Sequence, residues 1–181
     1  MPDPRLNPSA GALAQDKPIA RIDPVPPNPE DPIVKPVFDA IRSRGGEPLN
    51  MHRTLANAPQ VFKAYVDLAI ALSTGAVVPR KYRELIIIRT AQKAGGDYEV
   101  AEHRPMALSC GLTRAQLDAI ATWQNSSEFD ARERAILAFA EEMAADKGVS
   151  DATFKSLAEH FNPREIVELT ITAGFYAAAA P

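Results

Sequence analysis

The chain has 181 residues, of which 46% are hydrophobic and 24% are charged, and its formal net charge is -3. This composition is typical of a globular domain with one buried core, and the small negative charge gives no electrostatic basis for binding nucleic acid. The single cysteine, Cys110, excludes an intrachain disulfide and a Cys-x-x-Cys redox pair.

Two further features bear on where the protein is found. No apolar run approaches the roughly 18 residues that a membrane-spanning helix needs. The N-terminus lacks the basic segment and the apolar stretch of a signal peptide. We therefore expect a cytoplasmic protein that acts neither in a membrane nor on nucleic acid.

The first 32 residues contain nine of the sixteen prolines. Each proline removes a backbone donor and fixes φ, so this arm is not expected to form a regular helix or a central strand. Two interpretations are open: a disordered leader, or an extended strap in which residues 19–25 pack on their own domain or on a neighbouring subunit. The sequence thus predicts a Pro-rich arm over 1–32 and one domain over 33–181.

From residue 33 onward, apolar residues recur at helical spacing between glycine and proline breaks. The triplet Ile86-Ile87-Ile88 alone is compatible with a strand, but the flanking Glu, Arg, Gln and Lys favour a helix. The chain is therefore predicted to be all-α with short loops. Start signals are expected at Val34, Met51, Pro59, Pro79, Asp97, Thr113, Asp130, Ser150 and Asn162, and stop signals at Gly45, Gly95, Gly111 and Gly148.

Three titratable side chains form the main candidate site. Glu84 lies at the start of an apolar helix, whereas Glu99 and His103 lie four residues apart on the next helix. Residues four apart share a helix face, so Glu99 and His103 can share a proton, and Glu84 can join them if the two helices pack side by side. The alternative is structural: Glu84 complements the helix dipole, and Glu99 and His103 form a solvent-facing pair of small stabilising value.

The segment 79–120 resembles the carboxymuconolactone decarboxylase family of the alkylhydroperoxidase D-like superfamily. The resembling features are the Arg-Glu-Leu-Ile helix start at 83–86, the Gly-Gly turn at 95–96, Glu99 with His103, and the turn at 110–113. The resemblance implies an alkylhydroperoxidase D-like bundle of about 7–9 helices that assembles as a homo-oligomer, a trimer or hexamer. The arm and the aromatic pair at 175–176 are candidate contacts between subunits.

In the redox members of that superfamily, a Glu precedes a Cys-x-x-Cys pair and a His follows the second Cys by four residues. Laid onto this chain, the Glu is Glu84, the His is His103, and the two cysteine positions fall on Gly96 and Glu99. Both thiols are therefore absent, as in the decarboxylase branch. Cys110 is expected to be a small packing residue.

What the resemblance then implies is cofactor-free acid–base chemistry, of lyase or isomerase type, on a small carboxylated or lactone substrate. We expect His103 to donate the proton, because imidazole titrates near neutral pH, and Glu99 or Glu84 to orient it. No metal is implied. Two alternatives stay open: a peroxidase that uses Cys110 with an external thiol, and a non-catalytic helical assembly module.

Substrate contacts are expected from residues near this group. Arg89, or else Arg83 or Arg104, can bind a substrate carboxylate with two parallel hydrogen bonds. Tyr98 adjoins Glu99 and is a further candidate. His52 lies in a short segment that can line a cleft, although a surface or capping histidine is the plainer interpretation.

Overall fold

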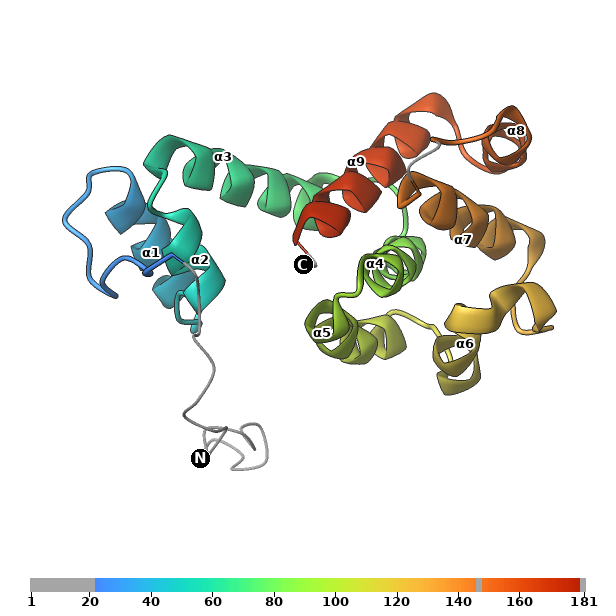
Figure 1. The fold of residues 1–181 in the computed structure, drawn as a ribbon, viewed down its shortest axis with the longest axis horizontal. Helices are drawn as coiled ribbons and strands as arrows, with labels where there is room; N and C mark the ends of the chain where they lie inside the picture. Colours follow the sequence, from blue (N-terminus) through green and yellow to red (C-terminus); the bar gives the residue numbers. More distant parts are fainter. Residues whose placement is uncertain (1–21, 146–147, 180–181) are drawn as a thin grey trace. The chain divides into compact units, whose positions relative to one another are not determined.

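The computed structural model describes residues 22–145 and 148–179, and within these ranges it contains helices and no β-strand (Figure 1). Backbone contacts divide the chain into an N-terminal unit, Met1–Ala69, and a C-terminal unit, Ile70–Pro181. Each unit has its own apolar core. The boundary expected between residues 32 and 33 stays a prediction, since residues 1–21 of the arm lie outside the described ranges.

The N-terminal unit contains α1 (Val34–Ser43), α2 (Asn50–Leu55) and α3 (Pro59–Ile70), the last of which ends one residue beyond the unit. Pro59 occupies the first position of α3, where a missing backbone N–H costs nothing. The rings of Phe38 and Phe62 pack edge to face, with centroids 5.8 Å apart. The buried members of this small core are Val34, Phe38, Ala56 and Phe62.

The described part of the arm is extended and packs on the N-terminal unit. The backbone N–H of Val25 donates to the carbonyl of Arg53 at 3.1 Å, and Arg53 Nε donates back to the carbonyl of Val25 at 2.8 Å. Asn57 Nδ2 donates to the carbonyl of Asp23 at 2.9 Å. Residues 23–25 therefore follow the strap interpretation, whereas Ile19 lies outside the described residues.

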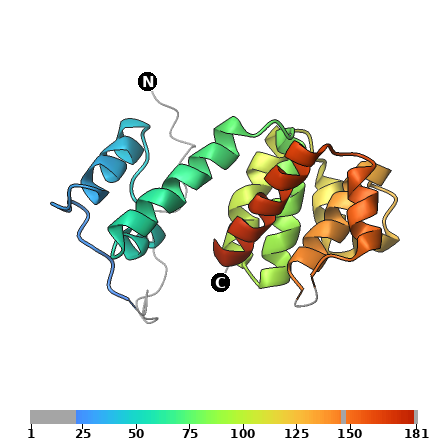
Figure 2. The same cartoon turned by 90° about the horizontal axis from the view of Figure 1, so that it is seen from above.

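The C-terminal unit is a bundle around α4 (Figures 1 and 2). Helices α5, α7 and α9 all contact α4, and α8 packs against α7 and α9. Among the described residues, no helix is both long and apolar enough to cross a membrane. The elements are a π-helical turn (Ala71–Gly75), α4 (Arg80–Ala94), α5 (Asp97–Ser109), α6 (Arg114–Ala119), a 3-10 turn (Ile120–Asn125), α7 (Ala131–Met143), α8 (Asp151–Ala158) and α9 (Pro163–Ala179).

Helix α4 is buried on every side along most of its length. Residues 83–91 are all buried, and they include Ile86, Ile87 and Ile88. A helix that is surrounded by other helices has no solvent-facing side, so this buried segment does not show the one-sided apolar stripe of a surface helix. The central position of α4 places the start of this helix, and with it Glu84, inside the protein.

Local capping chemistry sets most helix starts in the C-terminal unit. The side chains of Thr113, Asp130 and Ser150 each accept a hydrogen bond from the backbone N–H three residues later, as predicted. Asn162 and Glu165 likewise exchange side-chain-to-backbone bonds at the start of α9. Asp97 differs from the prediction: it lies inside the first turn of α5, and Gly96 is the cap residue.

Candidate active site

Glu84 is the fifth residue of α4, just after its first turn, and is completely buried. One of its carboxylate oxygens, Oε1, accepts a hydrogen bond from Nε of Arg80, which lies one turn earlier on the same helix. The other oxygen, Oε2, is 2.7 Å from Nδ1 of His103 on α5. Glu84 therefore bridges a guanidinium and an imidazole in the interior, which is more than the helix-dipole role requires.

His103 is buried, with 6% of its surface exposed, and two groups hold its ring. Nδ1 faces Glu84, and the ring of Tyr176 on α9 packs edge to face against the imidazole with centroids 4.9 Å apart. A carboxylate that already accepts from a guanidinium can only accept, so Nδ1 carries the proton of this contact. In the neutral imidazole, Nε2 is then left with a lone pair and can act as a base.

Glu99 lies one turn before His103 on α5, and its Oε2 is 3.7 Å from Nε2. That separation is longer than a hydrogen bond but places the two groups in direct electrostatic contact. Burial raises the pKa of the Glu99 carboxyl, and the positive charge of protonated His103 opposes this rise. The structure thus brings Glu84, Glu99 and His103 together as a connected acid–base group.

Three of the other residues expected at the site lie elsewhere. Arg89 donates to Glu141 from Nε, at 3.0 Å, and again from Nη2, and it does not point to His103. Tyr98 is largely exposed at the start of α5. His52 belongs to the N-terminal unit, where its Nδ1 accepts from the backbone N–H of Leu49 at 3.1 Å, which is the capping role considered for it.

The two alternative arginines are also engaged in other contacts. Arg83 donates from Nε to the carbonyl of Val78 at 3.0 Å, and from Nη1 to the carbonyls of Leu72 and Ser73 in the π-helical turn. Arg104 pairs with Asp118 of α6 at 2.5 Å. These contacts hold loops and helices in place and leave neither guanidinium beside the imidazole.

Arg80 and Tyr176 contact the site directly, and sequence reasoning missed both. Arg80 had a usable signal, because it lies four residues before Glu84 just as Glu99 lies four before His103. Tyr176 had none, since it comes from a helix more than 70 residues away in the sequence. The sequence predicts that the aromatic pair at 175–176 contacts another subunit, whereas the structure places the Tyr176 ring on His103 of the same chain.

Cys110 lies just after α5, partly buried, and its Sγ is 3.3 Å from the carbonyl oxygen of Ala107. Burial raises the pKa of this thiol, and the negative charge of Glu84 raises it further. The positions that carry the paired cysteines in redox relatives are Gly96, the cap of α5, and Glu99. Across the described residues, no group of three or more His, Cys, Asp or Glu side chains is placed to hold a metal ion.

A second buried acid gives an internal comparison. Glu133 lies in the first turn of α7 and accepts hydrogen bonds from Gln116 Nε2 at 3.1 Å and from the backbone N–H of Asp130 at 3.0 Å. Lys81 Nζ is 2.7 Å away, and its contact with Glu133 raises the pKa of this lysine. The contacts of Glu133 join α7 to α4 and α6 and cap the start of α7, and none of them involves an imidazole.

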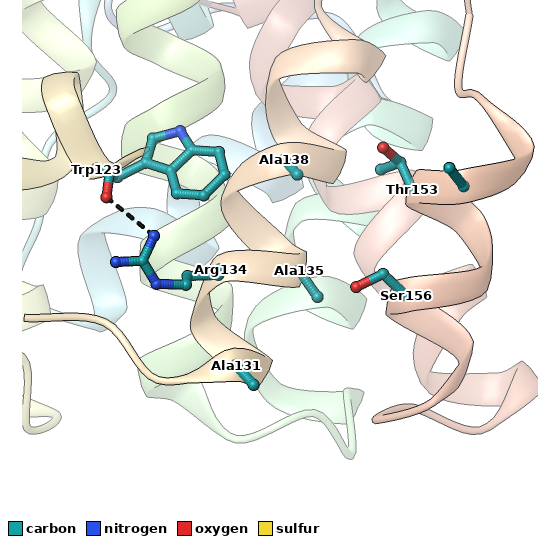
Figure 3. Close-up of a pocket in the computed structure, with 8 residues that line it drawn as sticks. Trp123, Ala131, Arg134, Ala135, Ala138, Thr153 and Ser156 are labelled. Atoms are coloured by element: carbon teal, nitrogen blue, oxygen red, sulfur yellow. Dashed lines mark hydrogen bonds between the residues drawn. The ribbon is translucent and has the colours of Figure 1, made fainter. Parts of the chain in front are cut away.

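A hollow of about 300 Å³ lies between α7, α8 and the 3-10 turn (Figure 3). Trp123 and Arg134 form one side of it, and Thr153 and Ser156 of α8 form the other. The Arg134 guanidinium donates to loop carbonyls that include those of Trp123 and Phe129. None of the lining residues belongs to the group around Glu84 and His103.

Comparison with solved structures extends the description of the fold. A protein of unknown function from Agrobacterium tumefaciens, described as a candidate antioxidant defence protein AhpD, is 25% identical with a TM-score of 0.64, and the match covers 70% of this chain and 87% of that one. The debrominase Bmp8, solved as a cysteine-to-alanine variant with 2,3,4-tribromopyrrole, is 22% identical with a TM-score of 0.70 and 91% coverage of both chains. An uncharacterized peroxidase-related protein from Ralstonia eutropha, described as an alkylhydroperoxidase AhpD core, is 23% identical with a TM-score of 0.68, covering 89% of this chain and 88% of that one.

The sequence itself matches one family. Residues 59–142, which contain Glu84, Glu99 and His103, match the profile of the carboxymuconolactone decarboxylase family. No curated protein matches the chain. The segment that holds the candidate site is therefore similar to the carboxymuconolactone decarboxylase family, and the chain shares its all-helical fold with AhpD-like proteins.

Proposed function

We propose that the C-terminal unit is a cofactor-free acid–base enzyme of lyase type, acting on a small carboxylated lactone. The observation that carries this proposal is the buried contact of 2.7 Å between Glu84 and His103, with Arg80 on the second carboxylate oxygen. This arrangement orients the imidazole and fixes which ring nitrogen faces the carboxylate, as the positioning of a catalytic proton donor requires. Nε2, on the other side of the ring, is the atom that exchanges the proton with substrate.

The proposed step is decarboxylation. The bond between the carboxylate carbon and the lactone ring breaks, CO2 leaves, and the electron pair stays on the ring carbon in conjugation with the lactone carbonyl. The proton on Nε2 of His103 then adds to that carbon, so that carboxylate plus one proton gives the decarboxylated lactone and CO2. Glu99, whose pKa is raised by burial, can return a proton to Nε2 for the next turnover. An isomerase would use the same two proton transfers.

The peroxidase alternative depends on Cys110. Peroxide reduction needs a thiolate, and burial together with the Glu84 charge raises the pKa of this thiol and so lowers the thiolate fraction. This favours acid–base over thiol chemistry. Peroxide consumption with dithiothreitol, at a rate that depends on Cys110 in a Cys110→Ser comparison, would instead support the peroxidase.

The direct test uses carboxymuconolactone with the full chain and measures CO2 release. We expect His103→Gln, which keeps a side-chain donor for Glu84, to lower kcat by about 10²–10⁴-fold. His160→Gln is the matched control, because His160 lies at the end of α8, and it should leave kcat unchanged. Melting temperatures show that each variant is folded. Unchanged turnover in a folded His103→Gln variant would remove the proposed mechanism.

A further inference from the structure

Arg80 has the geometry of an anion-binding residue. Its side chain lies beside the buried pair and is 34% exposed, so it can be reached from solvent. Nε donates to Glu84, and Nη2 donates to the thioether of Met106 at 3.5 Å. Within the described residues, Nη1 makes no hydrogen bond. A thioether is a weak acceptor, so a ligand oxygen can replace it at little cost.

The arginines first considered for this role are already occupied. Arg83 is bound to backbone carbonyls, Arg89 to Glu141, and Arg104 to Asp118. Each of these contacts would have to break before the guanidinium could bind a substrate. Arg80 needs no such exchange, because among the described residues the fork formed by Nη1 and Nη2 contacts only the Met106 sulfur.

We propose that the Nη1–Nη2 fork of Arg80 binds the carboxylate of a small anionic substrate, displacing the Met106 sulfur, while Nε stays on Glu84. This inference rests on the proposed function for its location and adds the anchor and the ligand class. A guanidinium fork matches the two oxygens of a carboxylate, which makes the recognition specific for planar anions. The Glu84 carboxylate lies between this anchor and Nδ1 of the imidazole, so the anchor is one side chain away from His103.

The neighbouring charges are compatible with an anion at this position. Arg83 lies close enough to Arg80 and Glu84 to interact with both electrostatically, and it contributes a second positive charge. The negative charge of Glu84 is shared between Arg80 and His103 rather than facing the free end of the fork. Glu99 lies on the Nε2 side of the imidazole, not on Arg80.

The test measures binding, with benzoate as the probe and benzamide as its uncharged equivalent. The protein has only three histidines, so the imidazole nitrogens of His103 can be followed by NMR with 15N-labelled histidine. We expect benzoate to shift the His103 signals saturably and benzamide to leave them in place. In Arg80→Gln the benzoate affinity should fall at least about tenfold, the loss typical of one charge-assisted pair. Arg104→Gln removes the same charge from a similarly exposed arginine that pairs with Asp118 and should bind benzoate as the wild type does.

Three results would overturn the proposal: equal benzoate affinity in Arg80→Gln and wild type, equal affinity for benzamide and benzoate, or the same loss in Arg104→Gln. If Arg80→Gln does not fold, Arg80→Lys retains the positive charge beside Glu84 but lacks the fork. Its benzoate affinity should also fall, and wild-type affinity in that variant would refute the anchor. Turnover is not the readout, so a failure of decarboxylation leaves this result standing, and the reverse also holds.

Discussion

Replacing Glu84 by Gln tests the central contact of the site with almost no change in side-chain volume. In the wild type, both carboxylate oxygens accept, one from Arg80 and the other from Nδ1–H of His103. A Gln side chain has one oxygen and one NH2 group. The oxygen is expected to stay on the Arg80 guanidinium, which can only donate, so the NH2 group faces Nδ1. The imidazole must then accept at Nδ1 and move its proton to Nε2.

The size of the effect on stability follows from these two bonds. A hydrogen bond to a charged group contributes about 1.5–3 kcal/mol and a neutral one about 0.5–1.5 kcal/mol, so the His103 bond loses about 1 kcal/mol. The Arg80 bond keeps its charged donor but loses the charge of its acceptor, which costs up to about 1 kcal/mol more. Solvent screens the contribution of Arg80, because a third of its side chain is exposed. We therefore expect Glu84→Gln to lower the free energy of unfolding by about 1–2 kcal/mol, or about 2–8 °C in Tm. The cost in kcat should be much larger, up to about 10⁴-fold, because the imidazolium that donates the proton loses its carboxylate partner at Nδ1.

The assay is 15N NMR of the neutral imidazole, in which protonated and unprotonated ring nitrogens have well-separated shifts. His52→Gln and His160→Gln variants assign the three histidines. Glu141→Gln is the control, because Glu141 also accepts from an arginine but lies on α7 and contacts Arg89 and Trp123. It should lower Tm and leave the His103 tautomer unchanged. A His103 that keeps its proton on Nδ1 in Glu84→Gln would refute the reasoning.

Three further predictions concern other contacts. Burial raises the pKa of Glu99, so the native state holds this proton more tightly than the unfolded state. The free energy of unfolding therefore falls as pH rises from the unfolded pKa of Glu99 through its folded pKa. Glu99→Gln should raise Tm at pH 7 and should lose this advantage at pH 4, as measured by thermal melts over a pH series. Gln116→Ala removes donors to Glu133 and part of the α6 cap and should cost about 1–3 kcal/mol in urea unfolding, whereas Gln124→Ala at the surface should cost under 0.5 kcal/mol. Light scattering should give the mass of a trimer or hexamer, and a monomer would contradict the proposed assembly.

Helix boundaries could be predicted from the sequence wherever a few neighbouring residues determine them. The caps at Thr113, Asp130 and Ser150 depend on one side chain and a backbone N–H three residues later, so local sequence contains the whole interaction. The helical state of Ile86-Ile87-Ile88 followed from its polar flanks. Burial of this segment on all sides depends on α5, α7 and α9, which local sequence does not reveal.

The candidate site was predictable only in part, for the same reason. Four-residue spacing joined Glu99 to His103, and the family resemblance added Glu84. Arg89 was placed wrongly because five residues rotate a helix by about 500°, which puts this side chain about 140° away from Glu84 and toward Glu141. Tyr176 required knowledge of how α9 packs on the site, which no spacing rule supplies.

The two buried acids of the C-terminal unit show why burial alone does not identify a functional residue. Glu84 and Glu133 both lie near the start of a helix that packs in the core, and both are almost fully enclosed. Every partner of Glu133 is a permanent donor: an amide, an ammonium group and a backbone N–H. Glu84 instead contacts an imidazole, which can both donate and accept a proton, and an arginine that solvent reaches. A buried carboxylate that only joins helices has no need of either partner, so the choice of partners, rather than the acid itself, marks Glu84 as the residue for chemistry.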